Sequence, residues 1–482
     1  MAHVASPSTS HDHHCWEKVI EDSITVTKTL GLDYLWVNRI CINESDDNKT
    51  LHQIRQMDQI YATAALTIIA AAGSGPDHGL PGVNGTLRVP QGDFIFPNIR
   101  LVSTLPKGDH TIRSSKWSTR GWTYQESLLS TRRLIFTETQ VFFECNGMHC
   151  SEVMRLPLDD MHDSRKIKFD MFAYEKGALQ AKAPGLDPHK YMKFFHQYCF
   201  RELSHPTDRL NAFQGIINSF KRAKRPVYTF WGLPIFIKES DLSRWSAQMK
   251  LTRSRTARFL TSFFWQFYNS SKGVISRNGM DFPSWSWVGW NGSVSSFLPV
   301  CSKNGCCFSD ARVWLQKPCK TTIDFEVVEL SPRMSAVEDL FLRKILVEGW
   351  TTPVRTELLA SDKSSRHPKH VKPRDGTYLI FSSDTQVNIY PELGPYDRSW
   401  VFSFERPLLG FLPSAHGPLG KDYCWGDYGL LLEKVDAGHY ERVGHFSLFR
   451  CWKWDEQRRR WDVSTRNGGG GINATRQLFE LG

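Results

Sequence analysis

Residues 34–42, YLWVNRICI, form the stretch on which the fold prediction depends. Large apolar and β-branched side chains occupy most of its positions, which is typical of a strand buried on both faces of a sheet. A second run of this kind, LTIIAAA at 66–72, follows it. Strand, helix and strand in this order predict a parallel βαβ unit that contains both runs. The helix is predicted by apolar residues at helical spacing, namely Leu51, Ile54, Met57, Ile60, Tyr61 and Ala64.

The segments on either side extend the α/β prediction to a domain of residues 16–155. Upstream, apolar residues recur at helical spacing from Trp16 to Leu30, and Gly31 takes the position where glycine commonly ends a helix. Downstream, the sequence predicts a strand at 99–103, a helix from about residue 123, and a hairpin of strands 133–137 and 140–145.

The remaining parts of the chain differ from this domain in their patterning. Periodic apolar stretches at 191–203 and 208–220 predict helices, whereas short β-branched and aromatic stretches dominate after Phe282. A chain of 482 residues is long enough for such a multidomain organisation. The predicted segments are a disordered leader at 1–15, a mainly helical segment at 156–280, a β-rich C-terminal region at 281–460 and a flexible tail at 461–482.

Composition narrows the classes of function. The formal net charge is +10, but lysines and arginines are dispersed, so we expect no sequence-specific binding of nucleic acid. The apolar runs are too short to cross a bilayer, and the N-terminus has no apolar core of a secretory signal, which predicts no membrane insertion. Eleven cysteines without a framework spacing indicate a reducing compartment, and hence a cytoplasmic location.

No metal or cofactor site is predicted. The sequence has neither the glycine-rich fingerprint of a dinucleotide site nor a phosphate-binding loop. Its cysteine clusters lack the paired short spacings of structural zinc sites; they are Cys145, His149 and Cys150, and Cys301, Cys306 and Cys307.

Polar residues gather at the end of the first predicted strand. Asn38, Asn43 and Glu44 lie in or just after 34–42, and ligands of open parallel sheets bind outside the carboxyl ends of the strands. These side chains therefore form one candidate binding site. The alternative is that Asn43 and the acids cap the following helix.

A second candidate site is the segment RGWTYQE at 120–126. It combines a cation, a large ring, and an amide beside an acid within one short stretch, and this suits a recognition or catalytic cluster. The alternative is a buried polar network in which a carboxylate neutralises the cation and locks the helix to the sheet. The residues concerned are Arg120, Trp122, Gln125 and Glu126.

Three ordered blocks resemble the HET domain of fungal heterokaryon-incompatibility proteins. They are EDSITVTKTLGLDYLWVNRICINE (21–44), QIRQMDQIYATAALTIIAAAG (53–73) and STRGWTYQESLLSTRRLIF (118–136). The likeness continues in DRLNAFQGI (208–216), WGLPI (231–235) and FPSWSWVGW (282–290).

The chain departs from the family pattern at three points. The family's opening ALSYvWG block is not found, its usual aspartate is Asn38 and its usual glutamine is Glu44. We therefore expect a divergent or truncated member.

The resemblance implies a parallel βαβ core similar to that of TIR domains. It also implies a signalling role in non-self recognition and regulated cell death, with protein partners or self-association. An alternative is cleavage of NAD as a substrate, for which Glu126 is the catalytic candidate because it matches the family pattern; no cofactor is expected. A basic regulator associated with nucleic acid is a third reading. The family-motif residues that become candidates for ligand binding are Trp36, Asn38, Cys41, Asn43, Glu44, Tyr61, Arg120, Gly121, Trp122, Gln125 and Arg132.

Overall fold

A computed structural model divides the chain into two compact units. The first comprises residues 1–186 and 201–219, and the second comprises residues 187–200 and 220–482. The residues that the structure describes are 16–42, 47–146, 149–153, 190–236, 254–263, 265–267, 276–278, 281–292, 294–296, 311–331, 337–357, 378–382, 385–391, 408–412, 428–435, 438–447, 451–455, 460–464 and 475–482.

The first unit is built on a four-stranded sheet with the order β1-β4-β5-β6. Strands β1 and β4 are parallel, and β4, β5 and β6 are antiparallel neighbours. The strands are β1 (Thr67–Ala70), β4 (Arg132–Phe136), β5 (Val141–Cys145) and β6 (His149–Ser151). The helices are α1 (Lys18–Thr29), α2 (Asn38–Cys41), α3 (Asp47–Thr63), η1 (Pro76–His78), α4 (Gly108–Ser114), α5 (Lys116–Thr119), α6 (Trp122–Leu129), η2 (Pro206–Arg209) and α9 (Asn211–Lys221), whose last two residues fall in the second unit.

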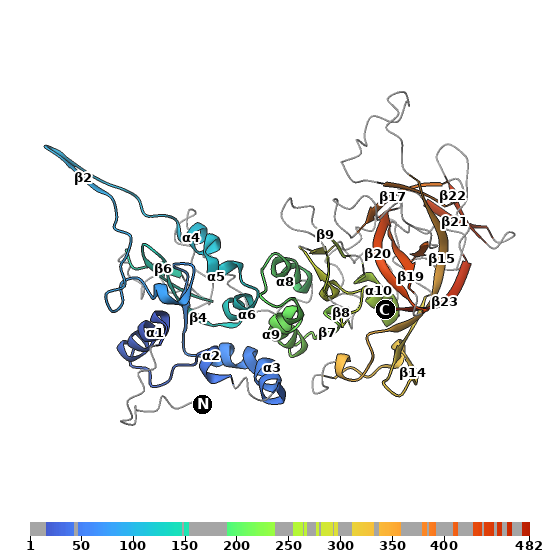
Figure 1. Cartoon of the computed structure of the whole chain (residues 1–482), viewed down its shortest axis with the longest axis horizontal. Helices are drawn as coiled ribbons and strands as arrows, with labels where there is room; N and C mark the ends of the chain where they lie inside the picture. Colours follow the sequence, from blue (N-terminus) through green and yellow to red (C-terminus); the bar gives the residue numbers. More distant parts are fainter. Residues whose placement is uncertain are drawn as a thin grey trace. The chain divides into compact units, whose positions relative to one another are not determined.

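Both faces of this sheet are covered, as the apolar character of β1 requires. Successive side chains of a strand point to opposite faces. On one face, Ile69 and Ile135 pack with Ile112 of α4, which is 2% exposed. On the other, Phe136 packs with Val26 of α1. Figure 1 shows β4 and β6 between α1 and the pair α4 and α5. Helices therefore cover both faces of the sheet, and the mixed α/β content predicted for this part is present.

Several elements of the first unit follow the sequence pattern. Helices α1, α3 and α6, strand β1 and the β4–β5 hairpin all lie where they were predicted. Gly31 has a φ of +68°, the left-handed conformation expected of a glycine at a helix end.

The prediction of a strand at 34–42 is wrong. Residues 38–41 form the short helix α2, and the residues before it pair with no strand of the described chain. A strand buried on both faces would have to bury the charge of Arg39. Instead Arg39 lies at the surface in an ion pair with Glu17. The parallel partner of β1 is β4, so the βαβ unit of 34–42 and 66–72 is not formed, and a TIR-like core is not confirmed.

The strand predicted at 99–103 exists but lies outside the main sheet. It is β3 (Ile99–Val102), which forms a two-stranded hairpin with β2 (Asp93–Phe96). All eight residues of these strands are exposed.

The mainly helical character expected for 156–280 is not confirmed. Two predicted helices are present as α8 (Lys190–Cys199) and α9, but a buried hairpin follows them. That hairpin joins β7 (Val227–Phe230) and β8 (Leu233–Phe236), and α10 (Arg255–Thr261) comes after it.

The β-rich C-terminal region of the second unit is confirmed. Within the described residues, nine strands form one sheet that closes on itself, because β15 pairs with both β16 and β18. Its strands are β13 (Arg312–Gln316), β14 (Thr322–Asp324), β15 (Ile345–Glu357), β16 (Tyr378–Ser382), β17 (Thr385–Pro391), β18 (Leu408–Leu412), β19 (Tyr428–Lys434), β20 (Tyr440–Ser447) and β23 (Thr475–Leu481). Short ribbons and turns are β9 (Trp265–Phe267) with β12 (Val294–Ser296), β10 (Ser276–Arg277) with β11 (Trp290–Asn291), β21 (Cys451–Asp455) with β22 (Arg460–Ser464), η5 (Trp287–Gly289), η6 (Phe325–Val327) and η7 (Val337–Asp339).

Tryptophans form the core of the second unit. Trp265, Trp285, Trp287 and Trp290 are each at most 1% exposed. The guanidinium of Arg442 lies 3.6 Å from the centre of the Trp265 ring and donates to the carbonyls of Phe263 and Trp265. This buried cation is thereby compensated by a ring face and two backbone acceptors.

Two further expectations concern the whole chain. Among the described residues, Cys41, Cys145, Cys150, Cys199 and Cys319 are free cysteines. Among the helices that the structure describes, none combines the length and the apolar character that crossing a bilayer requires.

Candidate functional site

The candidate site of the first unit centres on three polar side chains from three helices. Asn38 comes from α2, Tyr61 from the last turn of α3, and Glu126 from α6. The Tyr61 hydroxyl donates to the Asn38 amide oxygen at 3.1 Å. Both Tyr61 and Asn38 also form side-chain hydrogen bonds with the Glu126 carboxyl. The three side chains therefore form a closed triangle of hydrogen bonds.

Aromatic rings line this triangle. The rings of Trp36 and Tyr61 meet edge to face, with their centres 5.8 Å apart. Trp36 and Trp122 pack against a small core of Met57, Tyr61 and Leu129. Tyr61 is 7% exposed, whereas Trp36 and Trp122 are half-buried. Both tryptophans therefore keep part of their surface accessible to solvent.

The electrostatics of the triangle depend on the burial of Glu126. Burial raises the pKa of the Glu126 carboxyl, although its hydrogen bonds with Tyr61 and Asn38 and the positive charges of Arg120 and Arg201 act in the opposite direction. Burial and the nearby Glu126 charge raise the pKa of the Tyr61 hydroxyl well above its ordinary value. Tyr61 therefore stays a hydrogen-bond donor, and Glu126 keeps its proton to a higher pH than a surface glutamate does.

Arg120 is not the buried cation of the polar-network alternative. Its side chain is exposed, and its charge acts on Glu126 from the protein surface. Its carbonyl accepts from the Thr123 hydroxyl at 2.8 Å, which fixes the chain as it enters α6. The buried polar network is real, but it is made by Asn38, Tyr61 and Glu126.

The segment 201–209 supplies contacts that sequence reasoning missed. The Trp122 indole donates to the Asp208 carboxylate at 3.3 Å. The Arg201 guanidinium lies 4.5 Å from the centre of the Tyr124 ring. Asp208 is the first residue of DRLNAFQGI, a stretch that resembles the HET family, so this motif could have pointed to it. Arg201 lies in no such motif.

Gln125 and Gly121 hold α6 in place rather than join the triangle. Gln125 is fully buried; its amide oxygen accepts from the Gly215 N–H of α9 at 3.1 Å, and its amide nitrogen contacts the Met57 sulfur. The Gly121 N–H donates to the Glu202 carbonyl at 2.7 Å, and a side chain here would meet Leu203. The chain needs glycine at this close approach.

The remaining predicted residues lie outside the cluster. Cys41 accepts a hydrogen bond at its sulfur from the Val37 N–H, which closes the α2 turn. Arg132 is exposed on β4, whereas its neighbour Arg133 is fully buried. Asn43 and Glu44 lie outside the described residues. The two candidate sites of the sequence thus merge in part, through Asn38 and Glu126.

Comparison with known protein families supports the resemblance of residues 21–44, 53–73 and 118–136 to the HET domain. Residues 4–126 match the model of the family described as heterokaryon incompatibility protein (HET). The chain carries a HET domain. Searches of curated proteins and of solved structures find no match.

The polar triangle lies within the HET domain. Asn38 and Tyr61 come from its first two blocks, and Glu126 is the last residue of the match. Arg201 and Asp208, which contact α6 residues, lie beyond the match although they belong to the same compact unit. Segment 201–209, which follows the match in sequence, therefore contacts α6 of the matched region.

A second cluster of hydrogen bonds lies outside the HET match, at the turn between β7 and β8. Trp231 and Gly232 both have positive φ, at +49° and +74°. The Glu338 carboxyl accepts from both of their N–H groups, and burial raises its pKa to about 7. The Trp287 indole and the Tyr191 hydroxyl donate to the Gly232 carbonyl at 3.0 and 2.8 Å. The WGLPI and FPSWSWVGW stretches thus meet at one turn.

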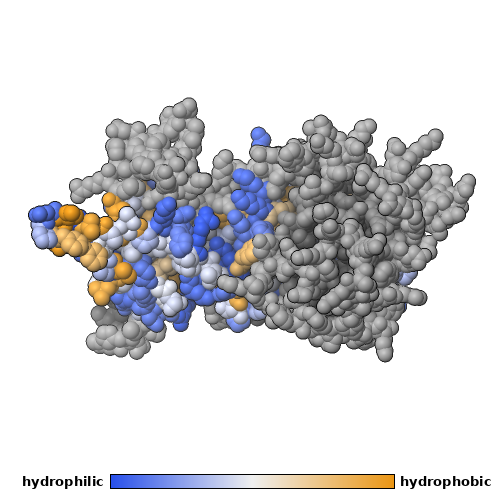
Figure 2. Space-filling model, turned by 90° about the horizontal axis from the view of Figure 1, so that it is seen from above, coloured by the Kyte–Doolittle hydropathy of each residue, from blue (hydrophilic) through white to orange (hydrophobic). Residues whose placement is uncertain are grey.

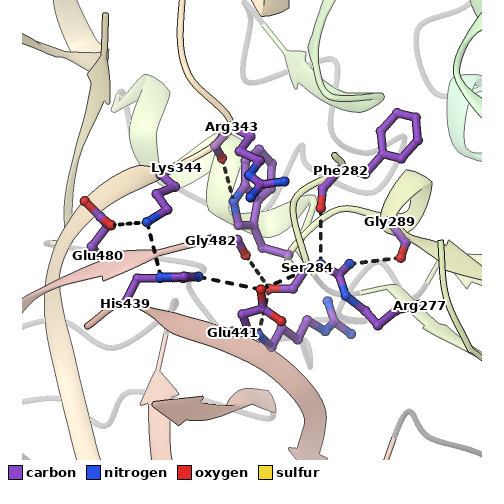
Figure 3. Close-up of polar contacts among 12 residues, drawn as sticks. Arg277, Phe282, Ser284, Gly289, Arg343, Lys344, His439, Glu441, Glu480 and Gly482 are labelled. Atoms are coloured by element: carbon purple, nitrogen blue, oxygen red, sulfur yellow. Dashed lines mark hydrogen bonds and ion pairs between the residues drawn. The ribbon is translucent and has the colours of Figure 1, made fainter. Parts of the chain in front are cut away.

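A third polar cluster braces the closed sheet (Figure 3). Lys344 lies between Glu480 at 2.9 Å and the Nδ1 atom of His439 at 3.2 Å. His439 in turn lies 3.6 Å from Glu441, whose carboxylate is 3.9 Å from Arg277. Burial and the Lys344 charge lower the pKa of His439. Each charge has an opposite neighbour, so we interpret this chain of contacts as a structural brace between β20, β23 and β10.

Proposed function

We propose that this chain is a signalling protein of the heterokaryon-incompatibility type, acting in non-self recognition and regulated cell death. The observation that carries the proposal is the polar triangle of Asn38, Tyr61 and Glu126 inside the HET match. Residues from separate blocks of the domain are brought together there by side-chain hydrogen bonds.

The surroundings of the triangle suit contact with a protein partner. Arg120 is exposed, and Trp36 and Trp122 are half-buried. Arginine and tryptophan are the residue types that most often dominate the energetics of protein interfaces. In this proposal the HET domain is the effector in the cytoplasm, and the second unit senses the partner.

The test is regulated expression of the full chain in a filamentous fungus. We expect wild-type protein to reduce cell viability after induction, and Glu126→Gln to abolish this effect at equal protein level. Glu21→Gln is the matched control, because it makes the same chemical change at an exposed position of α1. Unchanged viability with wild type, or an equal loss with both variants, would contradict the proposal.

A second candidate function is cleavage of NAD, and the position of Glu126 favours it. Loss of nicotinamide creates a cation-like centre on the ribose, which a nearby carboxylate stabilises. The Glu126 carboxyl forms hydrogen bonds with the side chains of Tyr61 and Asn38. The half-buried Trp122 lies on the same helix. Burial opposes ionisation of Glu126, so this activity would increase as the pH rises through the raised pKa of that carboxyl.

The enzymatic candidate has its own measurement. Purified full-length chain is incubated with NAD, and release of nicotinamide is followed over time. Release that is lost in Glu126→Gln and kept in Glu21→Gln would support it. If viability falls on induction but purified protein releases no nicotinamide, the signalling proposal stands and the enzymatic one fails.

A further inference from the structure

The β2–β3 hairpin carries the largest group of exposed apolar side chains among the described residues. Figure 1 shows it reaching away from the other elements of the first unit, and Figure 2 shows hydrophobic colour gathered at this projecting end. Its exposed apolar side chains, with their exposed fractions, are Phe94 (62%), Ile95 (80%), Phe96 (53%), Ile99 (60%), Leu101 (53%) and Val102 (49%).

The register of the hairpin sorts these side chains onto two unequal faces. Cross-strand partners share a face, and the partners are Phe94 with Leu101 and Phe96 with Ile99. These four residues, which we call the apolar face, include no polar group. The opposite face carries Asp93 and Arg100, whose side chains form an ion pair through both carboxylate oxygens.

A hairpin of this kind is not stable by itself. An isolated two-stranded ribbon is marginal in water and needs further strands, or packing on one face, to persist. In the described part of the chain, β2 and β3 pair only with each other. Both outer edges also offer unpaired backbone groups. Among the described residues, the hairpin therefore lacks the packing that its composition requires.

We propose that the apolar face of this hairpin binds the same face of a second copy of the chain. A two-fold contact brings Phe94, Phe96, Ile99 and Leu101 of each copy together and forms a small two-layered β-structure. Such an interface is self-complementary, as isologous dimers require. This inference goes beyond the proposed signalling function and does not depend on it.

Charge favours a second copy over a lipid surface. The hairpin, residues 91–103, contains one basic residue, Arg100, and Asp93 already neutralises it. Binding to anionic membranes uses unpaired lysines and arginines beside the apolar residues. Because the hairpin is neutral, two copies can approach through it although the whole chain carries a net charge of +10.

The area of the apolar face predicts a reversible dimer. Four side chains of this size, each somewhat more than half exposed, offer on the order of 400 Å² per copy. Two such faces bury roughly 800 Å² in total, which is at the weak end of specific interfaces. Dimerisation should therefore depend on concentration.

The test is sedimentation of the full chain over a roughly hundredfold range of concentration, in which mass action shifts the equilibrium. We expect wild type to pass from monomer to dimer, and F94S/F96S to raise the dissociation constant at least about tenfold. Ile95→Ser is the control, because Ile95 is even more exposed than the two phenylalanines but lies on the opposite face; it should dimerise as wild type does.

Three outcomes would overturn the proposal. Wild type could stay monomeric throughout the range, F94S/F96S could dimerise normally, or Ile95→Ser could weaken the dimer as much as F94S/F96S. Co-sedimentation with phosphatidylcholine–phosphatidylserine vesicles distinguishes the lipid alternative. Vesicle binding by a monomer that requires Phe94 and Phe96 would assign the face to lipid instead.

Discussion

Glu126 in the first unit and Glu338 in the second are both glutamates whose pKa values are raised by burial, but the two carboxyls are held differently. Glu338 accepts hydrogen bonds from the backbone N–H groups of one tight turn. Any carboxyl in that place could accept them, whatever the side chains of the turn. Glu126 is held by the side chains of Tyr61 and Asn38. Backbone amides fix a fold, whereas a set of side chains can be selected for a function.

The largest expected effect concerns the aromatic surroundings of the two carboxyls. Trp287, beside the Glu338 turn, is fully buried and packs on Phe195 and Tyr198. We expect Trp287→Ala to lower the free energy of unfolding of the second unit by about 3–5 kcal/mol. Trp122→Ala should cost the first unit less, because Trp122 is only half-buried. Urea denaturation of the full chain, followed by circular dichroism, measures both; equal losses would contradict the comparison.

Local patterns predicted much of the first unit. Strand β1 and the β4–β5 hairpin have apolar side chains on both faces, and α1 and α3 have apolar stripes, so each element is encoded in its own short stretch. The failure at 34–42 has a local cause too. Asn38 and Arg39 interrupt the apolar run, and the hydrogen bonds that Asn38 forms with Tyr61 of α3 and Glu126 of α6 outweigh strand propensity.

The sequence predicted the candidate sites less well than it predicted the helices and strands. Asn38, Tyr61 and Glu126 were each proposed through the family blocks, but their meeting depends on how three helices pack. Glu338 was not singled out at all. It lies in SAVEDL, a stretch without a motif, and its partners are backbone atoms of a turn more than a hundred residues away. Backbone N–H donors leave no residue pattern to find.

The second prediction uses the pKa of Glu338, which is about 7 in the folded protein against 4.5 ordinarily. The folded state binds this proton more tightly, so the contribution of Glu338 to stability is greatest below pH 4.5 and falls as the pH rises towards 7. The difference amounts to about 3 kcal/mol. Glu338→Gln should remove this slope. Urea midpoints of both proteins at several pH values test it; parallel profiles would show that the carboxyl does not titrate in this range.

A smaller effect is expected at Gly121, which supports the triangle indirectly. A methyl group there would lie 2.5 Å from the end of the Leu203 side chain and 3.3 Å from the Glu202 carbonyl. Leu203 can shift but the carbonyl cannot easily do so, and we expect Gly121→Ala to cost about 1 kcal/mol. Gly75→Ala is the control, since no atom lies within 4 Å of the added carbon. Equal stability of the two variants would show that segment 201–203 does not constrain α6.

The smallest effect on stability is expected at Glu126, and it is the sharpest test of the contrast with Glu338. Burial keeps Glu126 protonated to a raised pH, and a neutral glutamine resembles that protonated carboxyl in shape and hydrogen bonding. Glu126→Gln should therefore change the free energy of unfolding by less than about 1 kcal/mol, and it should be no less stable than wild type at pH 8.

A fold role and a functional role for Glu126 then separate cleanly. If the variant is as stable as wild type but has lost its effect on viability, Glu126 serves function through its charge or proton. If it unfolds under the same conditions in which Glu338→Gln stays folded, the triangle is a structural network. Glu126 would then be the structural glutamate of the two, because its side-chain partners would matter more for folding than the backbone partners of Glu338.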